Sequence, residues 1–361
     1  ECRARRIVTG YTARSFTTYV LLSDVTMSCA SPSPHVSGVR PTWAVAGGRI
    51  TVEGQGFDLN PLPEVRVGGR PCRVVFASPR ALDVVIPDGV EEGSASVQVG
   101  TMEPGAVFVE VGAPIAEGLH QVDSPVFDLA GNLYVTYSGT RGEQAPIGIF
   151  RIKSDGSREP FASKVPNPTS MAFAPSGDLY VSSRFEGKVY KVTPKGEVDV
   201  VVSKLGSTSG IVFDEAGTLF VGDRSGQIFR VEASGQTSVL ASLPSSIAAF
   251  HLAVGPGGTL YVTAPTLSTS DSLYRIDASG KVDVVHAGFG RPQGLAFDAD
   301  GKLHVVEALA GAAGLYALTE RGSMQLTLAA EALVGVAFGA SGEVVVASND
   351  TAYRLSPGEG R

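Results

Sequence analysis

The stretch Gly177-Asp-Leu-Tyr-Val181 decides the fold, because close copies of it recur through the last two thirds of the chain. Each copy opens with a glycine and a polar residue and continues with three residues, mostly apolar or aromatic, of the kind enriched in buried strands. The leading glycines are 40 to 46 residues apart. With the quoted stretch there are six copies, which begin at Gly131, Gly177, Gly217, Gly258, Gly301 and Gly342. Six copies at this spacing are typical of a six-bladed β-propeller with four strands, a to d from the axis outward, in each blade.

The ends of the repeat region predict how the ring closes. The last repeat runs out of chain after its third strand, while a surplus segment, Pro114-Ile-Ala-Glu117, precedes the first repeat. We expect this segment to form the outer strand of the sixth blade, because closure removes exposed sheet edges. The stretch 307–333 is rich in helix-favouring residues. The repeat phase nevertheless predicts strands at 315–318 and 324–328.

A different unit precedes the propeller. Glycine turns separate alternating strands over about 80 residues, a pattern that indicates an immunoglobulin-like β-sandwich. The stretch Ala46-Gly-Gly-Arg-Ile-Thr-Val-Glu-Gly-Gln-Gly-Phe57 resembles the IPT/TIG domain family, and the resemblance runs from about residue 34 to residue 112. We therefore predict an all-β chain with a TIG-like domain at 32–112 and a propeller at 113–361. Residues 1–31 are expected to be an extension that is disordered or not native to the protein.

The repeats also resemble a known group of propellers. The stretch Arg291-Pro-Gln-Gly-Leu-Ala-Phe-Asp298, followed by Gly301-Lys-Leu-His-Val305, is similar to NHL-repeat propellers and to the related gluconolactonase (senescence marker protein) family. These phrases build strands and turns, so they specify the fold better than the activity.

Composition and charge limit the classes of binding partner and the cellular compartments that we expect. The formal net charge is −7 and there is no basic cluster, so nucleic acid is not an expected partner. No apolar run approaches the roughly 18 residues that a membrane helix needs, so membrane insertion is not expected. The short apolar patch near the start ends at Asp24 and makes a poor signal-peptide core. A cytoplasmic location is favoured, and export stays open.

In a propeller the d–a and b–c connections lie on one face, around the mouth of the central channel. We call this the mouth face. Ligand groups usually come from such loops, because loops vary on a rigid frame. The candidate ligand-binding residues are His120, Tyr137, Arg184, Asp223, Arg224 and Gln293. The charged members would either form salt bridges between loops or recognise a carboxylate or a sugar. A small molecule or a peptide is the expected partner, and the oligomeric state stays open.

The gluconolactonase resemblance implies a divalent metal, Ca²⁺ or Zn²⁺, at the mouth of the channel. In that family a Glu-Gly-Pro phrase supplies one ligand, and here Asp123-Ser-Pro125 occupies its place. The corresponding places in other blades include Ser209 and Phe250, whereas a hard cation prefers several oxygen ligands. Asp123 is therefore either a metal ligand or a turn residue.

Two residues are candidate catalytic bases. His251 stands where the other blades begin strand a with a small residue, so its ring should lie near the axis as a general base or as a hydrogen-bonded channel histidine. Glu307 ends a strand at the mouth face.

These observations leave two candidate functions for the chain. One is a ligand- or partner-binding propeller with the TIG-like domain as spacer or second contact surface. The other is a gluconolactonase-like hydrolase that opens a lactone or related ester, with metal assistance.

Overall fold

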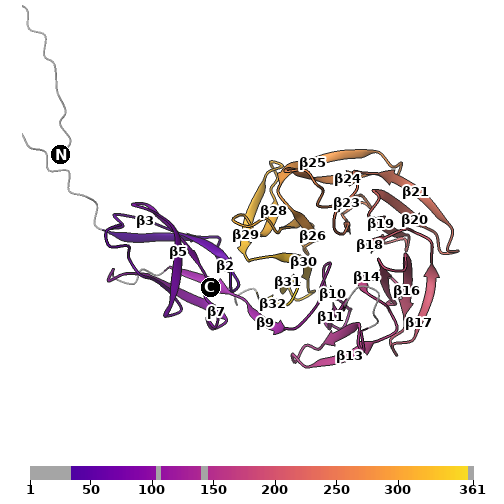
Figure 1. The fold of residues 1–361 in the computed structure, drawn as a ribbon, viewed down its shortest axis with the longest axis horizontal. Coiled ribbons are helices and arrows are strands. Elements are labelled where there is room, and N and C mark those ends of the chain that lie inside the picture. The colour runs from indigo at the N-terminus through magenta and orange to yellow at the C-terminus, as the bar shows by residue number, and fades with distance from the viewer. Residues whose placement is uncertain (1–33, 103–106, 140–144, 357–361) are drawn as a thin grey trace, which may run out of the picture.

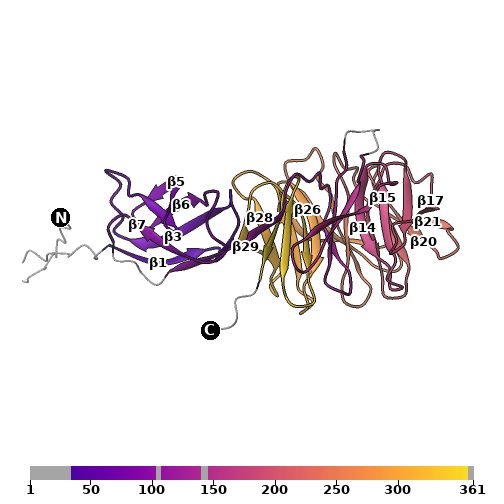
Figure 2. The same cartoon turned by 90° about the horizontal axis from the view of Figure 1, so that it is seen from below.

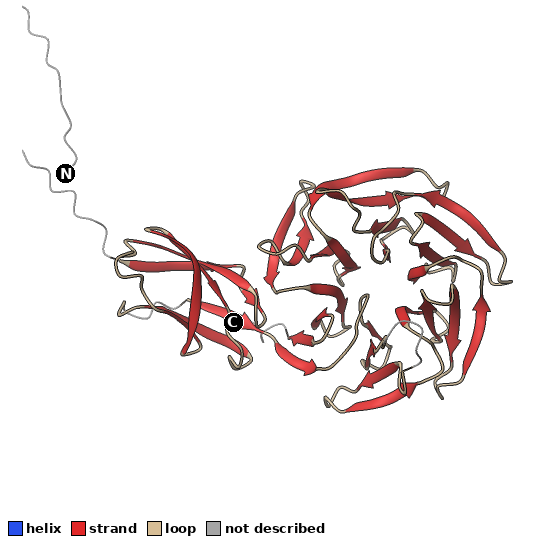
Figure 3. Cartoon of the chain, in the orientation of Figure 1, coloured by secondary structure: helices blue, strands red, loops and turns tan. Residues whose placement is uncertain are grey.

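The structure is a computed structural model that describes residues 34–102, 107–139 and 145–356. All regular secondary structure in these ranges is β-strand, as Figure 3 shows, so the predicted all-β class is confirmed. The extension expected at 1–31 lies outside the described residues. Within the described ranges, no helix is long and apolar enough to cross a membrane.

The first unit is a sandwich of short strands, and its strand β3 shows how the sequence positions the core. Ile50 and Val52 alternate with partly exposed residues and point into the apolar interior, as the period of two requires. The strands of this unit are β1 (His35–Arg40), β2 (Trp43–Ala44), β3 (Arg49–Gln55), β4 (Val65–Val67), β5 (Arg70–Ser78), β6 (Ala81–Val85), β7 (Gly93–Val99) and β8 (Phe108–Val111).

The second unit is a ring of six sets of four antiparallel strands, which we number as blades one to six (Figure 1). Blades one to three contain β10 (Val126–Phe127), β11 (Leu133–Thr136), β12 (Ile149–Ile152), β13 (Arg158–Ala162), β14 (Pro168–Phe173), β15 (Leu179–Ser183), β16 (Lys188–Val192), β17 (Val198–Val202), β18 (Thr208–Phe213), β19 (Leu219–Asp223), β20 (Gln227–Val231) and β21 (Thr237–Ser242). Blades four to six contain β22 (His251–Val254), β23 (Leu260–Thr263), β24 (Asp271–Ile276), β25 (Val282–Phe289), β26 (Pro292–Phe297), β27 (Leu303–Glu307), β28 (Gly314–Leu318), β29 (Met324–Ala329), β30 (Leu333–Phe338), β31 (Val344–Ser348), β32 (Ala352–Leu355) and β9 (Ala113–Ala116).

The ring closes as the sequence predicts. Strand β9, from the start of the propeller, pairs antiparallel with β32, from its end, and Ala116 faces Ala352. The strands β28 and β29 occupy the stretch that helix propensity alone would make helical. In both places the repeat phase, rather than local propensity, determines the structure.

The two units share one continuous sheet. Strand β2 pairs in parallel with β8 on one side and with β29 of blade five on the other, with Trp43 opposite Leu328. Five blades are therefore separate sheets, whereas blade five continues into the first unit. The cores also cross the joint, because Ala329 packs in the core of the first unit and Val45 packs among residues of blades five and six. Figure 2 shows the first unit against β28 and β29.

A repeated ring contact holds neighbouring blades together. In each case strand b of one blade presents a ring edge-on or tilted to a phenylalanine on strand a of the next blade, an arrangement that aromatic rings favour. The pairs are Tyr134–Phe173, Tyr180–Phe213, Tyr261–Phe297 and His304–Phe338, with centroids 5.2, 4.8, 5.2 and 4.7 Å apart. The last pair, between blades five and six, replaces the tyrosine with a histidine.

Candidate functional site

The starts of the inner strands crowd around the axis, which explains their small residues. A Cβ atom on Gly210 would lie 2.4 Å from the carbonyl oxygen of Phe250, and one on Gly335 would lie 2.3 Å from the Cα of Ser124. A side chain at either glycine would therefore collide with backbone. Because these neighbours are small, the centre has room for one large ring, which is His251 on β22.

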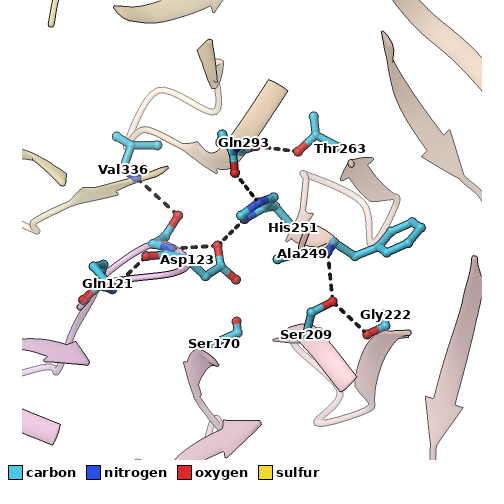
Figure 4. A network of polar contacts seen from close by, with 12 residues as sticks. Gln121, Asp123, Ser170, Ser209, Gly222, Ala249, His251, Thr263, Gln293 and Val336 are labelled. Carbon is cyan, nitrogen blue, oxygen red and sulfur yellow. Dashed lines mark hydrogen bonds and ion pairs between the residues drawn. The ribbon is translucent and has the colours of Figure 1, made fainter. Parts of the chain in front are cut away.

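His251 is fully buried and its ring contacts two other blades, as Figure 4 shows. Its Nδ1 lies 2.6 Å from Oδ1 of Asp123, in the segment that enters blade one, and its Nε2 lies 3.1 Å from Oε1 of Gln293 on β26 of blade five. Blades four and one are opposite in a ring of six, so the histidine–aspartate contact spans the axis. Both ring nitrogens are thus engaged with the protein itself.

The segment around Asp123 is held from several sides. Oδ1 of Asp123 accepts the backbone N–H of Ser124 at 2.7 Å, and its carbonyl oxygen accepts the side-chain amide of Gln121 at 2.7 Å. The oxygen of that amide accepts the backbone N–H of Thr136 on β11. Across the described residues, no three His, Cys, Asp or Glu side chains are grouped so that they could hold a metal ion. The metal role of Asp123 stays a prediction.

Glu307, the second candidate base, ends β27 and is buried. Its carboxylate accepts the backbone N–H groups of Gly290, Arg291 and Leu309 at 2.7, 2.8 and 2.7 Å. It thereby fixes the connection that enters blade five and the connection that follows β27. The catalytic role of Glu307 stays a prediction, and the geometry gives it a loop-bracing role.

Asp223 occupies the corresponding place in blade three, at the end of β19. Its carboxylate accepts the backbone N–H of Ser207 at 2.7 Å and both the backbone N–H and the hydroxyl of Ser225. Asp223 is buried and holds the backbone of the connection that carries Ser207. Its ligand-binding role stays a prediction.

Two of the predicted arginines meet in one pocket on the mouth face. Arg184 follows β15 of blade two and Arg224 follows β19 of blade three, and both line a pocket of about 190 Å³. The pocket is completed by Phe185, Asn167 and Ser207. The sequence pattern alone did not select Phe185 or Ser207. The position of Phe185, an apolar ring between two charged residues on a b–c connection, is the signal that could have identified it.

The guanidinium of Arg224 is fixed at one end only. Its Nη2 donates to the carbonyl oxygen of Ile247 at 2.8 Å, while its Nε is buried with no hydrogen-bond partner among the described residues. The acidic neighbour Glu186 is engaged elsewhere, by an ion pair with Lys188 at 3.0 Å and a hydrogen bond from Tyr190. Burial raises the pKa of Glu186, but the hydrogen bonds from Tyr190 and Lys188 outweigh that effect and lower the pKa overall.

The remaining predicted residues do not join this pocket. Gln293 belongs to the axial network described above. His120 and Tyr137 form an isolated bridge between the entry to blade one and the connection after β11, with their rings edge-to-face and 6.4 Å apart. The predicted set therefore divides into an axial network, a ring pair, an arginine pocket and two buried carboxylates, Asp223 and Glu307, that hold loop backbone.

Comparisons with known proteins agree with the architecture. The IPT/TIG domain family matches residues 34–108, so the first unit is an IPT/TIG domain. No curated protein matches the chain. An auxiliary nutrient binding protein from Bacteroides thetaiotaomicron is similar over 89% of this chain and 97% of its own, at 14% identity and a TM-score of 0.53. A gluconolactonase from Xanthomonas campestris is similar over 68% of this chain and 89% of its own, at 12% identity and a TM-score of 0.56. At such identities the likeness concerns the fold alone.

Proposed function

We propose that this protein is a ligand-binding β-propeller that holds a small carboxylate-bearing molecule in the mouth-face pocket between blades two and three. The IPT/TIG domain serves as a spacer or second contact surface. The observation that carries the proposal is that Arg184 and Arg224, from neighbouring blades, line one pocket of about 190 Å³. The planar guanidinium group matches a carboxylate with two parallel hydrogen bonds, which makes arginine the favoured residue for such ligands.

The other walls of the pocket suit an acid with an apolar body. Phe185 is about half exposed and offers a ring face or edge to a ligand, while Asn167 and Ser207 add polar groups. The floor is preformed: the side-chain amide of Asn167 donates to the carbonyl oxygen of Ser138 at 2.5 Å, and Asp223 holds the backbone of Ser207. Preformed loops lower the ordering cost of binding.

The two candidate bases, His251 and Glu307, give the hydrolase alternative less support. A general base needs a lone pair directed at a bound water or substrate. The nitrogens of His251 contact Asp123 and Gln293, and the carboxylate of Glu307 accepts three backbone N–H groups. These internal contacts favour binding over hydrolysis. That the propeller belongs with the NHL-repeat and gluconolactonase propellers in particular stays a prediction.

A thermal-shift experiment tests the proposal with benzoate, which has a ring and a carboxylate, and with benzamide, its neutral isostere. Ligand that binds only the folded state raises the midpoint of unfolding. We expect a concentration-dependent rise with benzoate, a much smaller one with benzamide, and loss of the benzoate effect in Arg224→Gln. An equal response to both compounds would contradict a carboxylate site.

The same preparation should be assayed for hydrolysis of glucono-1,5-lactone, with His251→Ala and Glu307→Gln as variants. We expect no turnover above the spontaneous rate. Turnover that disappears in a variant that remains folded would instead support the hydrolase, whatever the outcome with benzoate.

A further inference from the structure

Four large apolar side chains are exposed on the mouth face of blades two to five, each in a different connection. Phe185, which follows β15, is 51% exposed, and Leu267, which follows β23, is 89% exposed. Ile247, in the connection that enters blade four, and Leu309, which follows β27, are 43% and 48% exposed. A single exposed apolar residue is normal on a protein surface, whereas a group of them on one face is typical of an interaction site.

Contacts join the first three of these side chains across blades two to four. Arg224 lines the same pocket as Phe185 and donates from Nη2 to the carbonyl oxygen of Ile247 at 2.8 Å. The backbone N–H of Ile247 donates in turn to the carbonyl oxygen of Pro265 at 3.0 Å. Pro265 stands two residues before Leu267 in the same connection. The three apolar side chains therefore come from connections that contact one another.

Blade five extends this group. The hydroxyl of Thr263, at the end of β23, donates to the carbonyl oxygen of Gln293 on β26 at 2.5 Å, so the connections of blades four and five are neighbours. Leu309 lies against Gly290, because a Cβ atom on that glycine would be 2.2 Å from Cδ2 of Leu309. Arg291, the next residue, is exposed. We define the mouth band as Phe185, Arg224, Ile247, Leu267, Arg291 and Leu309.

The charge that a partner can reach along the mouth band is positive. The carboxylates at the strand ends are buried and accept backbone N–H groups; they belong to Asp223, Asp271 and Glu307. Glu186, within a connection, forms an ion pair with Lys188. The basic residues in the connections of blades two to five are exposed or half-buried; they are Lys164, Arg184, Lys204, Arg224 and Arg291. The carboxylates of this sector thus hold the loops, and the basic groups lie at the surface.

Apolar anchors beside accessible basic groups fit an acidic segment of a partner protein. Buried apolar and arginine side chains supply most of the energy of protein interfaces, and opposite charges align the partners. A nucleic acid fits less well, because proteins bind single strands by stacking bases on aromatic rings. Phe185 is the one aromatic side chain of the mouth band, and the net charge of −7 on the whole chain repels a polyanion.

We propose that the mouth band is a docking surface for an acidic peptide segment of another protein, with apolar side chains that pack on Leu267 and Leu309. The proposal goes beyond the small-acid site of the preceding section. Leu267, Arg291 and Leu309 lie outside the residues that line that pocket, so the two sites can be tested separately.

The test selects a phage-displayed library of random linear peptides against the immobilised full chain. The enriched peptides are then synthesised with a dye, and their binding is measured by fluorescence anisotropy. We expect the enriched peptides to carry a net negative charge together with apolar residues. A dye-labelled single-stranded oligothymidylate is measured in parallel, and we expect it to bind more weakly than these peptides.

Three variants locate the bound peptide. Leu267→Ser/Leu309→Ser should weaken binding by about tenfold or more, because it removes two apolar anchors. Arg291→Gln should weaken peptide binding several-fold and leave benzoate binding unchanged. Its effect on the peptide should shrink at about 1 M salt, where the screening length falls to about 3 Å. Val284→Ser is the matched control, because Val284 is 58% exposed on the outer strand of blade four, outside the mouth band. It should leave binding unchanged.

Four results would overturn the proposal. They are the absence of any enrichment, enriched peptides without a net negative charge, peptide binding that Leu267→Ser/Leu309→Ser leaves intact, and tighter binding of the oligothymidylate than of the peptides. Failure of benzoate to bind would leave each of these measurements informative, because the double variant does not touch the arginine pocket.

Discussion

Asp123 and His251 belong to opposite blades of the ring, and their side chains meet across its axis with 2.6 Å between Oδ1 and Nδ1. The pair is buried and is extended by Gln293 of a third blade (Figure 4). This contact ties together two blades that are not neighbours in the ring. We interpret it as an axial brace.

Replacing His251 with alanine should destabilise the propeller by about 3–5 kcal/mol, the usual cost of leaving one member of a buried pair alone. Urea unfolding measures the change. In the double variant Asp123→Ala/His251→Ala the loss should be clearly smaller than the sum of the single losses, because the two residues interact directly. Additive losses would show that the contact does not couple the two blades.

Glu307→Gln should lower the free energy of unfolding by about 1–3 kcal/mol, because a neutral amide offers one acceptor oxygen to backbone N–H groups that a carboxylate satisfies with two. Glu320→Gln, at an exposed turn of the same blade, removes the same charge and serves as the matched control. Urea midpoints of the two variants give the comparison. Equal midpoints would contradict the bracing role.

The free energy of unfolding should decrease as the pH falls below about 7, because of the titration of His304. Burial lowers the pKa of His304 below its ordinary value of 6.5, so just below that pH the unfolded chain binds more protons than the folded one. Protonation then favours the unfolded state, and stability is lost as the pH falls. Between about pH 7.5 and pH 5.5 the wild type should therefore lose stability relative to His304→Phe, which has no group to titrate there. Parallel urea curves at the two pH values measure this difference, and a constant difference would contradict it.

The joint between the domains should be sensitive to Gly48. A Cβ atom there would lie 2.3 Å from the carbonyl oxygen of Ala329, which accepts the backbone N–H of Val45. Gly48→Ala should therefore cost about 1–3 kcal/mol and expose Trp43 earlier during thermal unfolding. Gly38→Ala is the control, because its nearest neighbour would be a flexible carboxylate oxygen of Glu53 at 3.9 Å. Equal behaviour of both variants would show that the strands at the joint do not couple the domains.

The repeat spacing predicts the propeller and its closure well, because each blade is a local unit of about 40 residues whose strands pair with their sequence neighbours. The joint is different. The two-residue strand β2 carries no repeat signal, and its pairing with β29 joins residues far apart in the sequence. A pocket of about 490 Å³ that Trp43 and Leu328 line at this joint could not be predicted for the same reason.

Individual site residues are predicted only in part. The small residues at the same place in other blades predict that His251 lies near the axis. Its partner Asp123 is 128 residues away, and the contact between the two depends on how the ring closes. The sequence predicts Asp223 as a ligand-binding residue and Glu307 as a candidate base. The structure shows that backbone N–H groups occupy them, and a sequence gives no sign of which backbone groups need an acceptor. Arg184 and Arg224 share a pocket because their loops are equivalent in adjacent blades.

Isothermal titration calorimetry of benzoate into the wild type, Arg224→Gln and Arg291→Gln tests the carboxylate site between blades two and three. Arg291 is exposed on the same face but lies outside the residues that line the pocket, so its variant removes the same charge without touching the site. We expect one binding site in the wild type, an affinity lower by about tenfold or more in Arg224→Gln and an affinity close to that of the wild type in Arg291→Gln. Equal losses in the two variants, or no binding to the wild type, would contradict the carboxylate site.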